Sequence, residues 1–327
     1  MTRRDFLLHT GASALSLAWP AARAVATPAG AGLPLLRFAH LTDLHFTNRR
    51  QARYPTSHRH IRHAVARLNE QPLDFVLLTG DMFHFPEDLG HEMDALHDAL
   101  GALRHPWYAV FGNHDAEGPG VRARKSFVSR HLGDQGLAGG DAWYHFSPIP
   151  GLRVVVLDTT DVDTDGYHGW AGVLGDRQRR WLTEVLVRHR HETVIVAMHH
   201  PPVTPYPFLD NLKFAPRDAA WLAGALGTHP SVPLVLAGHF HFGALESFGR
   251  SRVLIGPSLV EHPHPYRIVE LWQPAAGPPE FRFSWHSLDL HGPDDAPCAL
   301  GPAGWRAFGL MRLSYAHSGA VRLQPSG

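Results

Sequence analysis

Five groups of aspartate, asparagine and histidine residues have the types and spacing needed to bind metal ions. Each group directly follows a short apolar run. In the last group, His239 and His241 lie two residues apart and project from the same side of an extended segment, which suits chelation. Nitrogen and oxygen ligands without thiolates favour Zn, Mn, Fe or Co over an iron–sulfur cluster or a structural zinc site. The groups are Thr42-Asp43-Leu44-His45, Thr79-Gly80-Asp81, Gly112-Asn113-His114-Asp115, His199-His200-Pro201-Pro202 and Gly238-His239-Phe240-His241.

The apolar runs that precede these groups resemble buried strands. Each run is brief, carries little or no charge and ends at polar or Gly residues, which is typical of strands covered on both faces. Amphipathic stretches separate the runs, and this strand–helix alternation favours a mainly parallel sheet covered by helices. The predicted strands are 36–41, 75–78, 108–111, 154–157, 194–198 and 234–237. The predicted helices are 58–68, 89–103, 176–187 and 217–226.

The positions of the polar groups along the predicted sheet indicate a common site. In open α/β sheets, ligands bind outside the carboxyl ends of the strands. Because five predicted strands end in one of the polar groups, we expect the groups to meet at one edge. Each group alone has an ordinary explanation as a solvated loop, a turn or a helix cap. Their joint occurrence at five strand ends makes a shared metal site the stronger interpretation.

The sequence divides into four parts. Residues 1–26 have the features of a targeting segment. Residues 27–34 form a Pro/Gly/Ala linker, and residues 35–291 form one α/β domain. Residues 292–327 form a C-terminal extension. Within the domain, the last four apolar runs lack intervening helices and are expected to be antiparallel strands; they are 244–248, 252–255, 266–271 and 280–287.

The targeting segment carries an arginine pair, Arg3 and Arg4, ahead of an apolar run over residues 6–19. This run is shorter than the about 20 residues that a membrane-spanning helix needs, so we expect no stable membrane anchor. The Arg-Arg-x-Phe-Leu pattern resembles a bacterial twin-arginine signal. That resemblance implies export of the folded protein by the twin-arginine (Tat) translocation machinery, and a periplasmic or secreted protein. An ordinary secretory signal is the alternative.

Composition excludes several classes of partner and site. The 30 Lys and Arg residues balance 30 Asp and Glu residues, and this formal charge of +0 argues against a nucleic-acid-binding platform. The single cysteine, Cys298, excludes an internal disulfide and a cysteine-based zinc cage. The chain contains 26 histidines, and their placement is therefore the informative feature. The sequence leaves the oligomeric state open.

The ordered set D-x-H, G-D, G-N-H-D, H-H-P-P and G-H-x-H resembles the motifs of the calcineurin-like metallophosphoesterases. Within that superfamily, the chain is most similar to the branch of the bacterial class III cyclic-nucleotide and glycerophosphodiester phosphodiesterases. The resemblance spans roughly residues 37–272. It implies an α/β fold, a four-layer αββα sandwich with two mixed β-sheets, and a binuclear metal site at the strand carboxyl ends.

The resemblance also implies roles for the site residues. Two divalent or mixed-valence ions (Zn, Mn or Fe) would act on a small-molecule phosphoester, with hydroxide bridging the ions as the nucleophile. His114 matches the family's substrate-facing histidine and would protonate the leaving group. His200 follows the ligand His199 and is expected behind it rather than on a metal. Asp43, His45 and His241 would hold one metal, Asn113, His199 and His239 would hold the other, and Asp81 would bridge both.

Four further residues have open roles. Asp115 could orient His114 or stabilise its charge, although adjacent side chains usually point apart. In purple acid phosphatases, a tyrosine three residues after the bridging aspartate binds ferric iron; His84 occupies that position here, so a ferric-tyrosinate centre is not expected. His84 could contact substrate or metal, or face solvent in a loop. His262 and His264 lie where this branch often lines its pocket, and either could be adjacent to substrate.

The sequence favours a phosphodiesterase and leaves alternatives. A phosphomonoesterase of the same fold would use the same ligands. A non-catalytic metal-binding protein would fit the many histidines and the predicted export, but such a protein would cluster its histidines in tracts. A metallo-β-lactamase-type hydrolase would need an H-x-H-x-D-H cluster, which this sequence lacks.

Overall fold

The structure is a computed structural model of the chain. The structure describes residues 33–47, 54–84, 89–116, 125, 141–160, 171–203, 216–290 and 318–323. The predicted targeting segment (1–26), nearly all of the linker (27–34) and most of the C-terminal extension (292–327) lie outside the described residues. Among the helices that are described, none is long and apolar enough to cross a membrane.

The first sheet combines early and late parts of the chain. Its strands β1, β2 and β3 are parallel to one another, whereas β10 pairs antiparallel with β1 and continues through β11 to β12. The order is β12-β11-β10-β1-β2-β3. The strands are β1 (Leu33–Leu41), β2 (Phe75–Leu78), β3 (Trp107–Ala109), β10 (Pro265–Gln273), β11 (Glu280–Ser287) and β12 (Ser318–Arg322). β12 lies within the predicted C-terminal extension and adds an edge strand to the sheet.

The second sheet also has six strands, in the order β4-β5-β6-β7-β9-β8. The four inner strands are parallel, and the edge strands β4 and β8 pair antiparallel with β5 and β9. The strands are β4 (Tyr144–Ile149), β5 (Leu152–Val156), β6 (Thr193–Ala197), β7 (Leu234–Ala237), β8 (Ala244–Phe248) and β9 (Ser251–Ile255). β9 pairs antiparallel with β8, as expected, but it lies parallel to β7, because the β8–β9 hairpin folds back against that strand.

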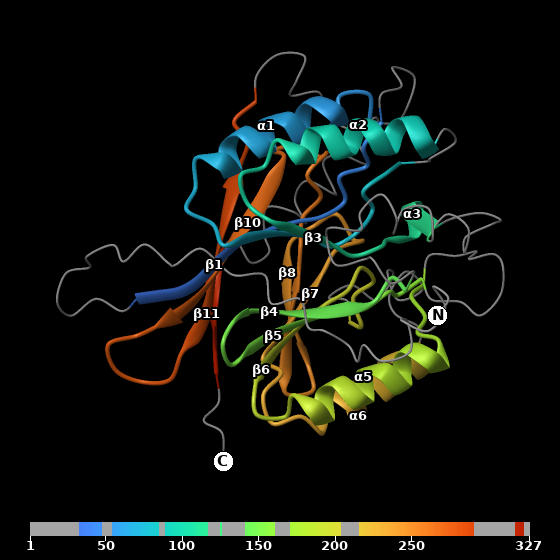
Figure 1. The fold of residues 1–327 in the computed structure, drawn as a ribbon. Coiled ribbons are helices and arrows are strands. Elements are labelled where there is room, and N and C mark those ends of the chain that lie inside the picture. Colours follow the sequence, from blue (N-terminus) through green and yellow to red (C-terminus); the bar gives the residue numbers. More distant parts are fainter. Residues whose placement is uncertain are drawn as a thin grey trace, which may run out of the picture. The chain divides into compact units, whose positions relative to one another are not determined.

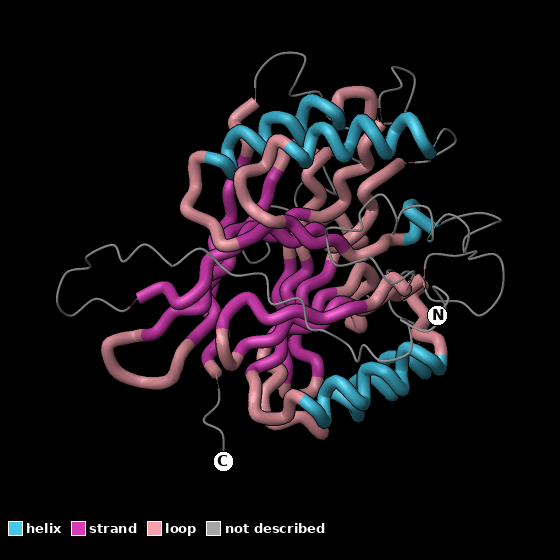
Figure 2. Tube along the Cα trace, in the orientation of Figure 1, coloured by secondary structure: helices cyan, strands magenta, loops and turns pink. Residues whose placement is uncertain are grey.

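Helices cover the outer face of each sheet (Figures 1 and 2). α1 (Ser57–Asn69) and α2 (Leu89–Gly101) lie on one side of the paired sheets, and α5 (Asp176–Arg188) and α6 (Pro216–Gly227) lie on the other. A short helix, α3 (Asn113–Ala116), follows β3. The four layers confirm the predicted αββα arrangement with two mixed sheets. The strand and helix bounds differ from the predicted ranges by a few residues; β4 and β12 were not predicted.

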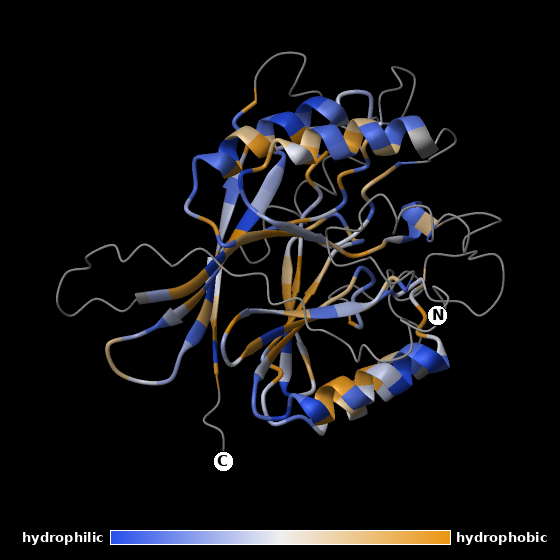
Figure 3. Ribbon diagram, viewed as in Figure 1, coloured by the Kyte–Doolittle hydropathy of each residue, from blue (hydrophilic) through white to orange (hydrophobic). Residues whose placement is uncertain are grey.

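Two hydrophobic cores hold the helices on the sheets. Val76 and Leu78 of β2 pack with α1 and α2, while Val194 and Val196 of β6 pack with α5 and α6. The opposite faces of the strands meet between the sheets, where Phe75 lies edge-on to Phe146 with ring centroids 5.6 Å apart. Full burial of such side chains contributes about 1.5–3 kcal/mol each. Figure 3 shows this pattern, with hydrophobic strands and many hydrophilic positions on the covering helices.

Candidate metal centre

The carboxyl ends of β1 and β2 are joined by main-chain hydrogen bonds that continue past both strands. The Asp43 N–H donates to the Gly80 carbonyl (3.0 Å), and the His45 N–H donates to the Asp81 carbonyl (2.9 Å). These bonds fix the two loops side by side and place their acidic side chains at one edge. Because β2 and β3 are also parallel, the Asn113 segment ends at the same edge.

The backbone of the candidate ligands is unusual. Five of them have positive φ angles, in the left-handed region that few non-glycine residues adopt. Such conformations cost roughly 1–3 kcal/mol each and cluster at functional sites, where the surrounding structure enforces them. The residues and their φ angles are Asp43 (53°), His45 (39°), Asp81 (50°), His239 (73°) and His241 (62°).

The first group of ligand atoms consists of Asp43, His45, Asp81 and His241, which lie within 4.8 Å of one another. The His45 and His241 Nε2 atoms are 3.0 Å apart, and His241 Nε2 lies 3.2 Å from Asp43 Oδ1. Asp81 Oδ2 lies 3.9 Å from His45 Nε2. The exposed fraction of His45 is 1%, and that of Asp43 is 0%. These four side chains come from three different strand ends.

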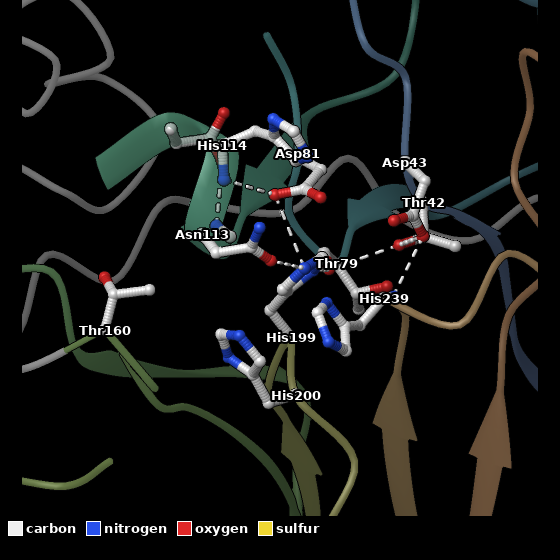
Figure 4. A network of polar contacts seen from close by, with 12 residues as sticks. Thr42, Asp43, Thr79, Asp81, Asn113, His114, Thr160, His199, His200 and His239 are labelled. Atoms are coloured by element: carbon white, nitrogen blue, oxygen red, sulfur yellow. Dashed lines mark hydrogen bonds and ion pairs between the residues drawn. The ribbon is translucent and has the colours of Figure 1, made fainter. Parts of the chain in front are cut away.

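The second group faces the other carboxylate oxygen of Asp81, and Figure 4 shows Asn113 and His199 beside that carboxylate. His199 Nε2 is 3.4 Å from Asp81 Oδ1 and 3.1 Å from the Asn113 Oδ1 atom. The His199 Nδ1–H donates to the Thr79 carbonyl (2.7 Å), which turns Nε2 toward the cluster. The ring centroid of His239 lies 5.1 Å from that of His199. Asp81 therefore stands between the two groups and faces both.

The chemistry of this donor set fits metal ions. Within the described part of the chain, Asp43 Oδ1 and His239 Nε2 are buried without a hydrogen-bond partner. Two imidazole Nε2 atoms also face each other at 3.0 Å, in His45 and His241, beside a carboxylate. Buried charges and polar atoms of this kind are costly unless they are paired or coordinate a metal. A cation would satisfy these atoms together.

The pKa shifts of His239, His45 and Asp81 agree with that interpretation. Against the effect of burial, the Asp81 and Asp43 carboxylates raise the pKa of His199 to about 9, so a metal bound there would displace a proton. Burial lowers the pKa of His239 to about 3 and, with repulsion from His114, lowers the pKa of His45 well below its usual value. Both rings are therefore neutral near pH 7, the form that coordinates metals. Burial opposes ionisation of Asp81, but the neighbouring His199 and His114 bring its pKa well below the usual value. Asp81 is accordingly a carboxylate.

Glycines in the motifs allow the ligands to approach closely. A Cβ on Gly112 would overlap the Asp81 carboxylate, and a Cβ on Gly238 would overlap the Thr42 hydroxyl. That hydroxyl donates to Asp43 Oδ2 (2.7 Å), which also accepts the His239 N–H (3.1 Å). The glycines of G-N-H-D and G-H-x-H are thus required by the packing of ligands from neighbouring loops.

A sequence model of the calcineurin-like phosphoesterase family matches residues 36–243, more than half of the chain. The chain belongs to the calcineurin-like phosphoesterase family. The predicted family is thereby confirmed, and the ligand groups described above lie in or directly beside the matched region.

Curated relatives of this family member carry phosphodiesterase names. The chain is 31% identical over 199 residues to a probable cyclic nucleotide phosphodiesterase of Rhodococcus erythropolis, with 57% of each chain covered. It is 31% identical over 195 residues to a cAMP/cGMP dual specificity phosphodiesterase of Mycobacterium tuberculosis, covering 56% of this chain and 54% of that one. The match thus spans little more than half the length of these two relatives. It is 26% identical over 239 residues to a glycerophosphodiester phosphodiesterase of Enterobacter lignolyticus, covering 70% and 78%.

Solved structures share the fold. A dimetal phosphatase from Danio rerio superposes with a TM-score of 0.62 and 18% identity, over 78% of this chain and 97% of that one. A purple acid phosphatase from yellow lupin superposes with a TM-score of 0.54 and 11% identity, over 81% and 57%. At these identities the likeness concerns the architecture, the two sheets with their covering helices.

In this phosphoesterase-family chain, His114 is anchored at the edge of the metal cluster. Its main-chain N–H donates to Asp81 Oδ1 (2.9 Å), and its Nδ1–H donates to the His84 carbonyl (2.8 Å). Its ring centroid lies 4.8 Å from that of His45. The Nδ1–H bond fixes the ring orientation, and Nε2 lies on the opposite side of the ring.

Asp115 contacts main chain on two loops. Its Oδ1 accepts the Phe83 N–H (3.0 Å), and its Oδ2 accepts the Gly112 N–H (2.8 Å). Burial and the nearby Asp81 carboxylate raise the pKa of Asp115 to about 7. Through these two contacts, Asp115 holds the loops after β2 and β3 together next to His114.

The structure places His84 inside the site, whereas His262 and His264 lie outside both ligand groups. The exposed fraction of His84 is 8%, and its ring is nearly parallel to that of His114, with centroids 5.4 Å apart, so it is not a solvent-facing loop residue. His200 lies within the second group, because one of its ring nitrogens is within 4.8 Å of the ligand atoms of His199 and His239. Its Nδ1 is 2.7 Å from the Thr159 hydroxyl. His262 is exposed, whereas buried His264 packs on α1 rather than in a metal-binding group of the described residues.

Glu261 is a residue of the site that the sequence reasoning missed. Its carboxylate is buried and its Oε1 lies 2.8 Å from His241 Nδ1. A signal was present, because Gly256-Pro257-Ser258 follows a predicted strand, as the five polar groups do. The strand was expected to be antiparallel to its neighbours, whereas its parallel pairing with β7 brings its carboxyl end to the site.

Proposed function

We propose that this chain is a metal-dependent phosphodiesterase with a binuclear centre. The observation that carries the proposal is the position of Asp81 between the two ligand groups, with one carboxylate oxygen facing His45 and the other facing His199. Asp43, His45 and His241 would hold one ion, Asn113, His199 and His239 the other, and Asp81 both. Two divalent or mixed-valence ions (Zn, Mn or Fe) in such a site clamp phosphoryl oxygens and lower the pKa of bound water.

His114 supplies the proton for the leaving group. Its Nδ1–H is held by the His84 carbonyl and its main chain by Asp81, so the imidazole keeps one orientation at the edge of the cluster. Nε2 then carries the mobile proton to the departing alkoxide oxygen. General acid catalysis of this kind typically contributes 10²–10⁴-fold.

The preference for diesters rests on the relatives and on this proton donor. The relatives that match the chain are named as cyclic nucleotide and glycerophosphodiester phosphodiesterases. Such diesters expel an alkoxide, a poor leaving group that gains from a positioned imidazole. A substrate of this class would also need little charge neutralisation beyond that of the metal pair, since a diester carries one negative charge.

The test uses metal-free protein reloaded separately with Zn, Mn or Fe. We expect hydrolysis of bis(p-nitrophenyl) phosphate to exceed that of p-nitrophenyl phosphate, and Asp81→Asn to abolish both. A faster reaction with the monoester would replace the proposal with a phosphomonoesterase of the same fold. Two bound metals without turnover of either ester would indicate a non-catalytic metal-binding protein.

We also propose that residues 1–26 direct export by the twin-arginine machinery to the periplasm or beyond. The arginine pair Arg3 and Arg4 supports this proposal. Export of a folded chain would let the metals bind in the cytoplasm first. Replacement of both arginines by lysine should leave the protein in the cytoplasmic fraction; unchanged export would contradict the proposal.

A further inference from the structure

Glu261 lies in a segment that is fixed to the metal loops on both sides. The Ser258 hydroxyl donates to the Asp43 carbonyl (3.0 Å), and the Leu259 N–H donates to the Thr42 carbonyl (3.1 Å). On the other side, the Ser258 N–H donates to the His241 carbonyl (3.4 Å), so the chain that follows β9 crosses the ends of β1 and β7. They place the Glu261 carboxylate behind His241, where its exposed fraction is 1%.

The partner of His241 differs in kind from that of His199. The His199 Nδ1–H donates to a neutral main-chain carbonyl, that of Thr79, at 2.7 Å. The His241 Nδ1–H donates instead to a buried carboxylate, Glu261 Oε1, at 2.8 Å. A carboxylate behind a ligating imidazole fixes the tautomer and raises the basicity of the other ring nitrogen. The two predicted metal sites are therefore built with different electrostatics.

The ligands themselves add to this electrostatic difference, because the first site contains more negative charge than the second. In the first group, Asp43 supplies a carboxylate ligand, and Glu261 adds another carboxylate behind the imidazole of His241. In the second group, the corresponding oxygen ligand is the neutral amide of Asn113. Asp81 is shared by both groups and does not distinguish them. At short range in a buried site, such charge differences are only weakly screened by solvent.

We propose that Glu261 is a positioning residue that directs His241 Nε2 toward the first metal and strengthens metal binding at the Asp43–His45–His241 site. The inference rests on the binuclear centre of the proposed function. It assigns Glu261 no contact with substrate. Its effect passes entirely through the orientation of the His241 ring and the negative charge behind it.

The experiment compares two substitutions that separate charge from hydrogen bonding. Glu261→Gln keeps an oxygen that can accept the His241 Nδ1–H but removes the charge, whereas Glu261→Met removes both. Affinity for Co²⁺ and Zn²⁺ is measured by competition with a chelator, with bound metal counted by elemental analysis. We expect Glu261→Met to weaken one of the two sites by about 10–100-fold, the range typical for the loss of such a partner. Glu261→Gln should give a smaller loss at the same site.

Two backgrounds identify the site that is affected. In Asn113→Ala we expect the remaining ion to bind to the first group, and Glu261→Met should weaken its affinity by about 10–100-fold. In His45→Ala the remaining ion sits on the second group, and the same substitution should leave its affinity unchanged. Asp218→Asn is the matched control, because Asp218 is a buried carboxylate on α6 that pairs with Arg179 away from both groups.

Equal loss in the two backgrounds, or unchanged affinity in Glu261→Met, would overturn the inference. The melting temperature of the metal-free variants shows whether they fold. If Glu261→Met does not fold, the metal affinity of Glu261→Gln, which keeps the shape of the side chain, tests the inference instead. Because the readout is metal affinity, the result stands even if the wild-type chain hydrolyses no phosphoester. That outcome would overturn only the proposed function.

Discussion

At the scale of single residues, the site combines strained backbone with buried polar side chains. Left-handed aspartates and histidines and uncompensated buried atoms both cost free energy in the metal-free chain. Local propensity does not explain either feature. Binding of cations would compensate both, which is why these residues have a functional rather than a structural explanation.

His114→Ala should retain both metals and lose catalysis selectively. The imidazole matters most where the leaving group needs a proton, so we expect losses of about 10²–10⁴-fold on an alkyl or nucleoside phosphodiester. The loss on bis(p-nitrophenyl) phosphate, whose leaving group hardly needs a proton, should be much smaller. Steady-state rates and metal content measured on one preparation check this. Equal losses on both esters would assign His114 to phosphate positioning instead.

At the scale of elements, the rule that ligands gather at strand carboxyl ends predicted most of the site. The strands before Asp43, Asp81, Asn113, His199 and His239 were all predicted within a few residues, because short uncharged runs are distinctive. Pairing partners were harder to predict. The direction of β9 relative to β7 depends on how the β8–β9 hairpin pairs with β7. The spacing of apolar residues along the sequence does not specify that pairing. Glu261 was missed for this reason.

Asp115 should stabilise the connection between the loops after β2 and β3. Asp115→Ala leaves the buried Phe83 and Gly112 N–H groups without their acceptor, at a cost of about 1–3 kcal/mol for each unsatisfied donor. Asp115→Asn keeps one acceptor oxygen and should lose less. Urea unfolding of the metal-loaded proteins measures both. An unchanged free energy of unfolding in Asp115→Ala would show that the two loops are held without this carboxylate.

At the scale of the whole molecule, the abundance of histidine should make stability depend on pH. Burial, helped by the nearby Arg267, lowers the pKa of His40 from 6.5 to about 3. The unfolded chain therefore binds a proton here that the folded chain excludes. This contribution to stability is present above about pH 6.5 and is lost as the pH falls toward 3.

Acidification should accordingly destabilise the metal-free protein. At about pH 5, His40 alone accounts for a loss of about 2 kcal/mol relative to neutral pH, from 1.36 kcal/mol per pKa unit. His40→Gln should reduce the fall in the free energy of unfolding by that amount, measured with urea at both pH values. His262→Gln changes an exposed histidine and is the control. Identical pH profiles for wild type and His40→Gln would contradict the assignment.

The metal centre also joins the two sheets, because its ligands follow β1, β2 and β3 of one sheet and β6 and β7 of the other. Ions bound there would link both halves of the sandwich and would be held only by the folded chain. Chelation should therefore lower the melting temperature, and Zn or Mn at about 100 times its dissociation constant should restore about 2.7 kcal/mol for each site. Asp81→Asn, which weakens both sites, should respond far less to either treatment. A melting temperature that is the same with and without chelator would show that the sheets are held together by their hydrophobic contact alone.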